Sequence, residues 1–283
     1  MAGKFYAPVR APKAEPAKYG LINSKTVVTD ADRWEAGIDL DSVLCNVNLN
    51  NVEICDPSNE INILEPADTS NQNIPFVVEA EFSCSTFGFE SSDYRQKALD
   101  AMDLVQSMAV EHEFWTGELA AMDTTTDGGN PNRSLDSGTA EVVNPTVGTA
   151  VSVEYGIALL EGAIARSGSY RGFIHGSRAT IAVIADDLDN KGDVLKTSLG
   201  NYVIAGSGYT GSGTGVTDDT NNLAWIYATG PVGVYLSDID VVPDNLSEAV
   251  DTRVNTVTFR AQRTAAVVWD GCAHYGVLVD LSK

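Results

Sequence analysis

The chain has 283 residues, enough for about two domains with a sizeable core, and its 43% hydrophobic content excludes an intrinsically disordered protein. It carries 39 acidic and 18 basic side chains, a formal net charge of −21, so most of its surface should repel nucleic acid and anionic membranes. No signal-like apolar segment and no apolar span long enough for a membrane helix occur, so we expect cytoplasmic synthesis and no membrane contact.

The N-terminus is the basic part of the chain. Its first twenty residues contain one acidic side chain, Glu15, and four basic ones, which are Lys4, Arg10, Lys13 and Lys18. Prolines recur there at four-residue steps, which favours an extended, polyproline-like arm over a helix. Such a segment cannot build a core, so it is either a frayed tail or an arm that orders against a neighbouring subunit.

Two strand-like runs follow, over residues 34–55 and 74–89. The polar stretch between them, 56–73, contains two prolines, four asparagines and no lysine, which is typical of an exposed tip. Together the runs predict a long two-stranded extension. Because such a hairpin is marginally stable alone, we expect it to pack on something outside its own domain.

The strongest helix pattern covers residues 92–116, with Ser91 and Ser92 as caps and Gly117 as the stop. At 1.5 Å per residue this helix is about 37 Å long, which suits the backbone of an elongated molecule. Its predicted apolar stripe consists of Tyr94, Ala98, Ala101, Val105, Met108, His112, Trp115 and Leu119. We expect His112 to be a partly buried structural histidine, and Glu111 and Glu113 to face solvent without a special role.

A Gly-, Asn- and Thr-rich loop from Thr124 leads into a region of alternating helices and strands, about residues 146–245. Helices are predicted from Val151 and from Ser177. The predicted strands are 171–176, 201–206 and two strands within 225–236 that flank a turn at Gly230-Pro231. This region predicts a second compact unit.

The segment Thr256–Leu281 has the most regular pattern, and we interpret it as one long β-hairpin. One face of its first strand is apolar and consists of Val257, Phe259, Ala261, Ala265, Val267 and Trp269. Asp270-Gly271 would supply the positive φ angles of a tight turn, and alternation resumes from Tyr275. No catalytic motif interrupts this hairpin, so we expect it to be scaffold.

Motifs for cofactors and metals are incomplete, and we expect neither. Gly206–Gly211 matches G-x-G-x-x-G after a strand, but the following residues cannot open the required helix, so a flexible loop is favoured. Lys196-Thr197 lacks the second glycine of a phosphate loop. Asp187–Gly192 begins like a calcium loop, but Lys191 replaces a ligand and Ser198 replaces the glutamate.

Cysteine and histidine patterns point to no chemistry either. The four cysteines are too widely spaced for a secreted disulfide framework or a zinc site, and we interpret them as buried thiols; they are Cys45, Cys55, Cys84 and Cys272. None of the histidines, His112, His175 and His274, accompanies a marked nucleophile. We therefore expect no enzyme, although an active site assembled in space, as in a soluble α+β hydrolase, remains an alternative.

The order of arm, projecting hairpin, long helix, α/β insertion and closing strands resembles the major capsid proteins of tailed double-stranded DNA bacteriophages. Their shell fold is named for phage Hong Kong ninety-seven. The resemblance covers nearly the whole chain and is carried by three segments, 91–119, 225–245 and 253–281, without an invariant motif. Encapsulins, which are bacterial nanocompartments with the same shell fold, are the alternative family.

The resemblance implies an α+β fold with four parts. These are an N-terminal arm (1–35), an extended loop (36–90), a peripheral domain with spine helix and C-terminal hairpin (91–145 and 246–283), and an axial domain (146–245). It implies self-assembly as hexamers and pentamers into an icosahedral shell around double-stranded DNA. The protein would then be located in the virion and be assembled in the cytoplasm of a bacterial host.

The resemblance also implies partners and contacts. The arm would clamp neighbouring subunits, the extended loop would lie over an adjacent one, and the Gly-rich Gly206–Gly215 would meet its copies around the local axes. A portal and a scaffolding or decoration protein are expected partners besides other copies of the chain. Because the body of the chain is acidic, DNA should be contacted only weakly and without sequence preference.

Two departures from the family pattern are informative. Some members join their subunits by an isopeptide bond from a lysine in the extended loop, but no lysine lies between Lys25 and Lys97, so this cross-link is not expected here. The chain also lacks room for a long N-terminal scaffolding segment, so we expect a separate scaffolding protein or none.

The closing hairpin completes the predicted assembly contacts. Its face with Val257 and Trp269 should pack on Val105 and Met108 of the spine helix. Arg260 and Arg263 should lie on its other face, where an acidic neighbouring subunit could pair with them. With Lys4, Arg10, Lys13 and Lys18, they are the candidate contact residues, and Arg260→Glu should impair assembly more than folding.

Overall fold

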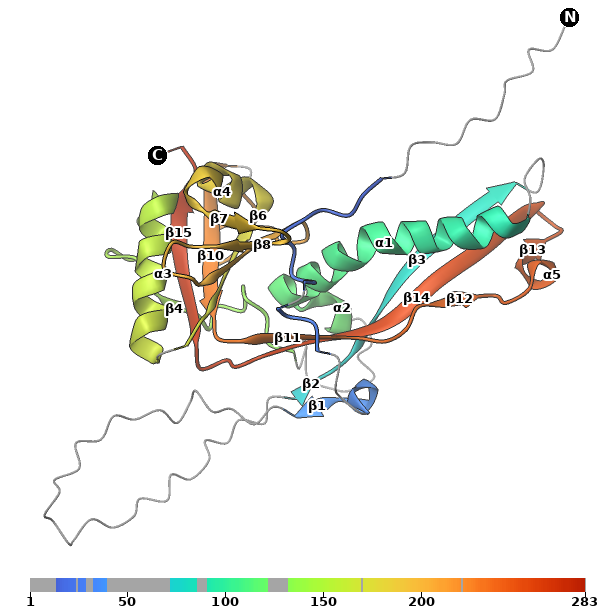
Figure 1. Ribbon diagram of the computed structural model, residues 1–283, viewed down its shortest axis with the longest axis horizontal. Coiled ribbons are helices and arrows are strands. Elements are labelled where there is room, and N and C mark those ends of the chain that lie inside the picture. Colours follow the sequence, from blue (N-terminus) through green and yellow to red (C-terminus); the bar gives the residue numbers. More distant parts are fainter. Residues whose placement is uncertain are drawn as a thin grey trace, which may run out of the picture.

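Two β-sheets and a long helix organise the part of the chain that the computed structural model describes, namely residues 14–23, 25–28, 33–39, 72–85, 91–121, 132–168, 170–219 and 221–282. The long helix, α1, lies along the first sheet, and the second sheet stands at the end of the molecule near the C-terminal end of α1 (Figure 1). None of the described helices is both long enough and apolar enough to cross a lipid bilayer.

The spine helix α1 (Ser91–Thr116) has the bounds that the sequence predicts to within one residue. It ends because Gly117 adopts a φ of 72°, and its N–H donates to the carbonyl of Glu113 at 2.7 Å. The short helix α2 (Glu118–Ala121) follows at once. The left-handed backbone conformation is readily adopted only by glycine. Gly117 therefore ends the helix, as the sequence predicts.

The predicted apolar stripe of α1 is only partly correct. Tyr94 and Ala98 are buried as expected, but the next fully buried residues are Met102 and Val110, whereas Met108 is 47% exposed. The 4-then-3 spacing chosen from the sequence follows one straight line along the helix. The real contact surface shifts around the helix because α1 packs on β3 and β14 and then, near its C-terminal end, on segments from the second sheet.

The first sheet is built around the central strand β14. Its members are β3 (Phe76–Ser85), β11 (Val232–Leu236), β12 (Asp240–Val242), β13 (Val250–Asp251) and β14 (Thr256–Trp269). β3 lies within the range predicted as extended loop, yet it pairs antiparallel with β14 from Phe76↔Ala265 to Ser85↔Thr256. The predicted apolar face of β14 is buried against α1, including Val257, Phe259 and Ala261.

The second sheet has the strand order β4-β15-β10-β6-β9-β8-β7, with β5 also beside β15. Its strands are β4 (Glu141–Val142), β5 (Val151–Ser152), β6 (Phe173–Ser177), β7 (Asp189–Lys191), β8 (Val194–Lys196), β9 (Tyr202–Gly206), β10 (Leu223–Thr229) and β15 (His274–Asp280). Helices α3 (Val153–Ser167) and α4 (Arg178–Val183) pack on it in a core separate from that of α1. Both helices are N-capped by serine, Ser152 and Ser177, and a short turn of helix, η3 (Ala185–Asp187), follows α4.

The predicted C-terminal hairpin is wrong, because β14 and β15 belong to different sheets. β14 pairs with β11 up to Trp269↔Val232, and β15 pairs with β10 from His274↔Thr229. The pairs β10–β15 and β11–β14 form one antiparallel ribbon, which bends where Gly230-Pro231 faces residues 270–273. The positive φ that the hairpin prediction required at Gly271 does not occur. Pro231 has no N–H to donate, so the ladder is interrupted where the ribbon passes from one sheet to the other.

The base of the predicted extension is described, but its tip is not. β1 (Ile38–Asp39) pairs antiparallel with β2 (Gln72–Asn73), so the two ends of the segment lie side by side. A turn of 3₁₀ helix, η1 (Trp34–Ala36), precedes β1, and residues 40–71 lie outside the described residues. A further short helix, α5 (Leu246–Ala249), joins β12 to β13.

The prediction that the cysteines are buried thiols is partly correct for Cys84 and wrong for Cys272. Cys84 is a free, half-buried thiol on β3. Cys272 is exposed and disulfide-bonded, so the interpretation is wrong for it. Cys45 and Cys55 lie outside the described residues.

Candidate functional site

The C-terminal half of α1 carries two carboxylates, Glu111 and Glu113, that the sequence analysis placed on a solvent-facing side of the helix. Both are almost completely buried, so that prediction is wrong. A carboxylate tolerates burial where hydrogen-bond donors replace its hydration, and both glutamates accept such bonds from the backbone of other segments. Each glutamate therefore connects separate segments of the chain through hydrogen bonds.

Glu111 joins the arm, the spine helix and the Gly-rich segment. Its Oε1 accepts from the N–H of Leu21 at 2.9 Å and from the hydroxyl of Ser107 at 3.0 Å, and its Oε2 accepts from the N–H of Gly208 at 2.9 Å. Burial raises the pKa of Glu111, and the donors from Gly208 and Leu21 oppose that rise. The carboxylate thus holds three segments that are distant in sequence.

The Gly-rich segment Gly206–Gly215 forms no helix, as the sequence predicts, and its first part packs against α1, whereas Thr214 and Gly215 are exposed. A Cβ at Gly208 would lie 2.1 Å from the carbonyl oxygen of Met108, so glycine is required for this contact. Gly206 and Gly211 are buried as well. These three glycines are packed within the chain itself, and the contact of this segment with other copies around the local axes stays a prediction.

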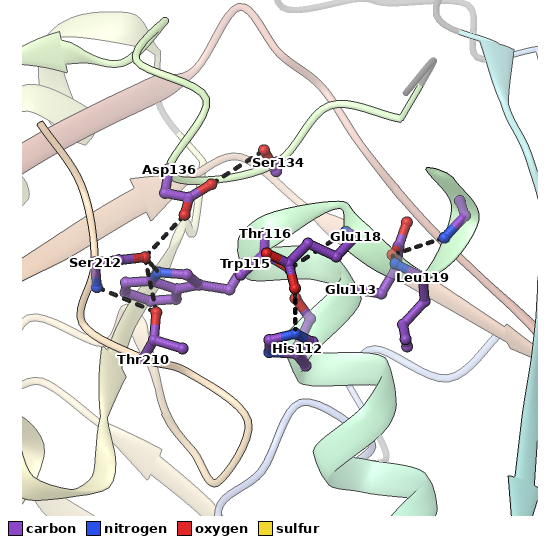
Figure 2. A network of polar contacts seen from close by, with 11 residues as sticks. His112, Glu113, Trp115, Thr116, Glu118, Leu119, Ser134, Asp136, Thr210 and Ser212 are labelled. Carbon is purple, nitrogen blue, oxygen red and sulfur yellow. Dashed lines mark hydrogen bonds and ion pairs between the residues drawn. The ribbon is translucent and has the colours of Figure 1, made fainter. Parts of the chain in front are cut away.

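Glu113 organises the end of α1 in a similar way (Figure 2). Its Oε2 accepts from the N–H groups of Leu119 at 2.6 Å and Ala120 at 3.1 Å, in the short helix α2. Its Oε1 accepts from Nδ2 of Asn132 at 3.0 Å, and the same amide bonds both the N–H and the C=O of Ile74. Glu113 therefore fixes α2 and, through Asn132, the entry to β3.

Trp115 anchors the segment 210–212 at the same end of α1 (Figure 2). Its Nε1 donates to Oγ of Ser212 at 2.9 Å, and that hydroxyl donates to Oδ2 of Asp136 at 2.8 Å. Thr210 donates its hydroxyl to the same oxygen of Ser212 at 2.7 Å. The Ser212 hydroxyl thereby uses its donor and both acceptor positions, so this network is complete without a ligand.

His175 is a fully buried polar residue of the second sheet. Its Nδ1 lies 3.1 Å from the hydroxyl of Tyr209 and its Nε2 lies 2.9 Å from Oγ1 of Thr229, and the ring packs edge-on against Phe114. Burial, together with the nearby His274, lowers the pKa of His175 to about 3. A neutral histidine with both ring nitrogens bonded stabilises the core and is not available to a substrate.

The other two histidines also have structural partners. Burial lowers the pKa of His274 to about 4, and its Nε2 lies 3.1 Å from the carbonyl oxygen of Leu135. His112, the partly buried structural histidine of the sequence analysis, is half-buried, and its Nε2 lies 3.1 Å from a carboxylate oxygen of Glu118 (Figure 2). No described group of three or more acidic, histidine or cysteine side chains could hold a metal ion.

The described part of the arm lies on its own subunit. The carbonyl of Tyr19 accepts from the N–H of Ala205 in β9 at 2.9 Å, and Thr26 and Val28 exchange backbone bonds with Val234 in β11 at 2.7 and 2.9 Å. Leu21 is fully buried. This strap, residues 19–28, crosses from the second sheet to the first, so this part of the arm is already occupied within the chain.

The candidate contact residues at the N-terminus lie mostly beyond this strap. Lys4, Arg10 and Lys13 are outside the described residues. Lys18 is exposed, and only its backbone carbonyl is engaged, by a guanidinium N–H of Arg178 at 2.9 Å. The structure therefore brings none of the described basic arm side chains together with a partner group.

Arg260 and Arg263 lie on opposite faces of β14 rather than on one. Arg260 faces solvent, where its Nε lies 2.9 Å from Glu79 and an Nη lies 3.5 Å from Glu81, both on β3. Arg263 points to α1 and donates to Oε1 of Gln106 at 2.6 Å and to the carbonyl of Ser237. Burial lowers the pKa of Arg263. The expectation that both share the outer face is wrong, because residues an odd number apart alternate across a strand.

A sequence signal for the buried glutamates did exist. Glu111 and Glu113 flank His112 between Val110 and the aromatic pair Phe114 and Trp115. Because glutamate side chains are usually exposed, the sequence analysis placed both of them in solvent. Their long-range donors, such as Asn132 and Gly208, lie 19 to 97 positions away, and periodicity cannot reveal them.

No protein-family profile matches the chain, and no curated protein is detectably similar to it in sequence. Solved structures do match. The capsid of Ralstonia phage GP4 has a TM-score of 0.55 and 11% identity, covering 99% of this chain and 95% of that chain. The capsid of an empty GTA particle has a TM-score of 0.55 and 13% identity, covering 96% of this chain and 100% of that one. A chain of Gordonia phage Cozz has a TM-score of 0.54 and 10% identity, covering 99% and 91%.

These similarities extend over both sheets and the spine helix. At such low identity they define the fold and nothing further. The fold is the Hong Kong ninety-seven type found in tailed-phage capsid proteins, an α+β architecture, as the sequence resemblance implied.

Proposed function

We propose that this chain is the major capsid protein of a tailed double-stranded DNA bacteriophage, a structural protein that assembles as hexamers and pentamers into an icosahedral shell. The observation that carries the proposal is the match of almost the entire chain, 99%, to 95% of a chain in the capsid of Ralstonia phage GP4. A partial match would leave room for another function in the unmatched part. Here almost no part of the chain is left unmatched.

The arrangement of buried polar groups supports a structural role over an enzymatic one. Glu111, Glu113 and His175 are all engaged by groups of the chain itself. A catalytic group needs an exposed side from which a substrate can be reached. We therefore assign these residues to the stability of the subunit and assign no catalytic residue and no cofactor.

The proposed domains follow the sheets rather than continuous stretches of sequence. α1 and the sheet around β14 form the peripheral domain, which includes β3, β11 and β12. The sheet around β10, with β15, α3 and α4, forms the axial domain. The bent ribbon β10–β11 and β14–β15 connects them. Residues 1–13 and the extension beyond β1 and β2 are the proposed contacts to neighbouring subunits.

The net charge of −21 supports a weak relation to packaged DNA. Phosphate binding gains affinity mainly by releasing counterions from DNA, which requires clustered cations. Most of the basic residues near the N-terminus would instead serve contacts between subunits. We further propose a portal and a scaffolding or decoration protein as partners, assembly in the bacterial cytoplasm and a final location in the virion.

Arg260 remains a proposed contact residue in a modified form. Its own Glu79 and Glu81 already pair with it, and its side chain is still 47% exposed. Exposed pairs of this kind contribute about 1 kcal/mol or less, so exchanging them for a partner in a neighbouring subunit costs little. Arg260→Glu would place three carboxylates together and should reduce assembly more than folding.

The decisive experiment is to express the chain alone and examine the product by size-exclusion chromatography and electron microscopy. Shells of megadalton mass or hexameric capsomers are the expected products. A 30 kDa monomer at every salt concentration would contradict the proposal. Co-purification of one enzyme inside empty shells would instead favour an encapsulin-type compartment.

A further inference from the structure

An apolar groove lies on the side of the second sheet that faces away from α1, next to α3. Its volume is about 520 Å³, and it runs between α3 and the connections that follow α4 and β8. The apolar lining includes Ile157, Ala158, Ile184 and Leu199. Leu199 is 80% exposed at its rim, so no other described part of the chain covers this surface.

Gly162 in the middle of α3 has no explanation within the subunit. A glycine inside a helix costs about 1 kcal/mol relative to alanine. Gly156, on the same helix, is required, because a Cβ there would lie 2.7 Å from Val279. At Gly162 a Cβ would meet only the end of the Arg166 side chain, at 3.5 Å. Gly162 lines the groove, so its missing side chain widens a surface that is open to the outside.

A second exposed apolar feature lies at the other side of the same domain. The segment 144–150 joins β4 to β5 and presents Val147, which is 84% exposed. The N–H of Thr149 donates to the carbonyl of Thr146 at 3.1 Å, and Gly148 has a φ of 74°, as the third residue of a type II turn requires. The turn therefore displays a valine at its second position.

This turn is rigidly anchored. The side-chain amide of Asn144, which is buried, bonds both the N–H and the C=O of Leu278 in β15 at 2.9 Å and also the C=O of Thr149 at 3.0 Å. A rigid loop loses little conformational entropy when it binds. An apolar side chain held at the tip of such a loop is well suited to a contact with another molecule.

The strand order puts the turn and the far wall of the groove toward opposite edges of the second sheet. β4 and β5 both pair with β15 at one edge of the sheet, whereas the groove opens toward the connections of β7, β8 and β9 at the other edge. Subunits arranged around a rotation axis of order five or six make head-to-tail contacts, which need two different complementary patches on opposite sides. The turn and the groove meet this requirement.

Charge is compatible with this pairing. The stretch from Val142 to Val153 contains no charged residue, although the chain has 39 acidic side chains. The groove has Glu154, Glu161 and Asp187 among its lining residues. An uncharged loop can approach these carboxylates without the repulsion that most of this acidic surface would cause.

We infer that Val147 of one copy inserts into the groove beside α3 of the next copy around a local axis of the shell. The inference rests on the proposed shell function and names the contact that closes each ring. Val147 would approach Ala158 and Gly162, and Leu199 would cover it from the rim. The occupant is thus a second copy of this chain.

The test is a pair of cysteines, Val147→Cys with Ala158→Cys, oxidised in assembled shells and analysed on a non-reducing denaturing gel. Because each subunit contributes one cysteine to each of two contacts, covalent pentamers and hexamers are expected. Each single variant controls for the natural cysteines and should give no such rings. Intact shells with no cross-link, or with dimers only, would overturn the inference.

A second variant separates this contact from folding. Val147→Asp should keep the circular dichroism spectrum and the melting temperature of the wild-type chain and reduce the yield of capsomers and shells at least tenfold. Val254→Asp, at a 65% exposed valine between β13 and β14, should leave the yield unchanged. Equal yields from both variants would refute the contact. A wild-type chain that forms no assembly would refute the proposed function itself.

Discussion

Glu111 illustrates at the residue scale how this subunit holds its parts together. Removing a carboxylate from water is costly, and here backbone N–H groups from the strap and the Gly-rich segment replace part of the lost hydration. The compensation is incomplete, because the pKa of Glu111 remains raised by burial. Glu111 therefore fixes the positions of the strap and the Gly-rich segment relative to α1, and adds less to the free energy of unfolding.

The buried histidines predict a dependence of stability on pH. Burial lowers the pKa of His175 to about 3 and that of His274 to about 4, whereas in the unfolded chain both titrate near 6.5. The unfolded chain alone binds protons between these values, so stability is complete above pH 6.5 and is lost as the pH falls. Each histidine should remove up to about 1.4 kcal/mol per pH unit from the free energy of unfolding. Urea denaturation at pH 7, 6 and 5 would measure this.

Matched variants assign the effect to a particular residue. His175→Gln should reduce the pH slope of the wild-type chain by about 1.4 kcal/mol per pH unit. Val254→Ala removes no titratable group at a 65% exposed position and should leave the slope as it is. Glu111 titrates with the opposite sign, but its contribution is common to all three proteins. Identical slopes for His175→Gln and the wild-type chain would show that the buried histidine is not responsible.

At the scale of elements, α1 shows that helix formation and helix packing depend on different information. Its bounds follow from local signals, namely the serines at its start and Gly117 at its end. Which residues of α1 are buried depends on two partners, the sheet of β14 and the segment 206–215, that approach different sides of the helix. The single straight stripe expected from the sequence therefore includes Met108 and omits Met102.

Truncating the two methionines tests this rotation of the contact surface. Met102 is fully buried, so Met102→Ala should lower the free energy of unfolding by about 2–5 kcal/mol. Met108 is nearly half exposed, so Met108→Ala should cost well under about 1 kcal/mol. Urea denaturation of the two purified variants gives the comparison. A larger loss for Met108→Ala would restore the stripe that the sequence suggested.

At the scale of the whole molecule, the bent ribbon connects the two sheets. β10 continues into β11 and β14 into β15, so both strands of the ribbon cross between the sheets at the same place. The strap at residues 19–28 makes a second connection, with bonds to β9 and β11. In the proposed shell, forces at one end of a subunit would have to reach the other end, and these two connections suit that task.

The lysine distribution predicts how the assembled shell behaves in denaturant. Because no lysine lies between Lys25 and Lys97, an isopeptide bond cannot start from the extended loop. Purified shells that are boiled in detergent with reductant should give a single band of 30 kDa. The reductant excludes disulfide bonds as the cause of any ladder, since Cys272 is disulfide-bonded. A ladder of multiples that survives reduction would contradict this prediction.

Much of the secondary structure could be derived from the sequence because it depends on neighbours along the chain. The start of α1 at its serines, the end of α1 at Gly117 and the apolar face of β14 all result from caps and from side-chain periods within a few residues. The order of these elements was also sufficient to indicate the shell fold. Local preference and order are properties of the sequence itself.

Only the tertiary structure decided which sheet each strand joins and which polar groups are buried. β14 and β15 alternate with the same period whether they pair with each other or with different sheets, so the sequence could not distinguish a hairpin from a ribbon shared between two sheets. Glu111, Glu113 and Gly208 acquired their roles from donors and carbonyls far away in sequence. The physical reason is that burial and strand pairing are non-local: they depend on what the rest of the chain places opposite a residue, and no window of sequence contains that information.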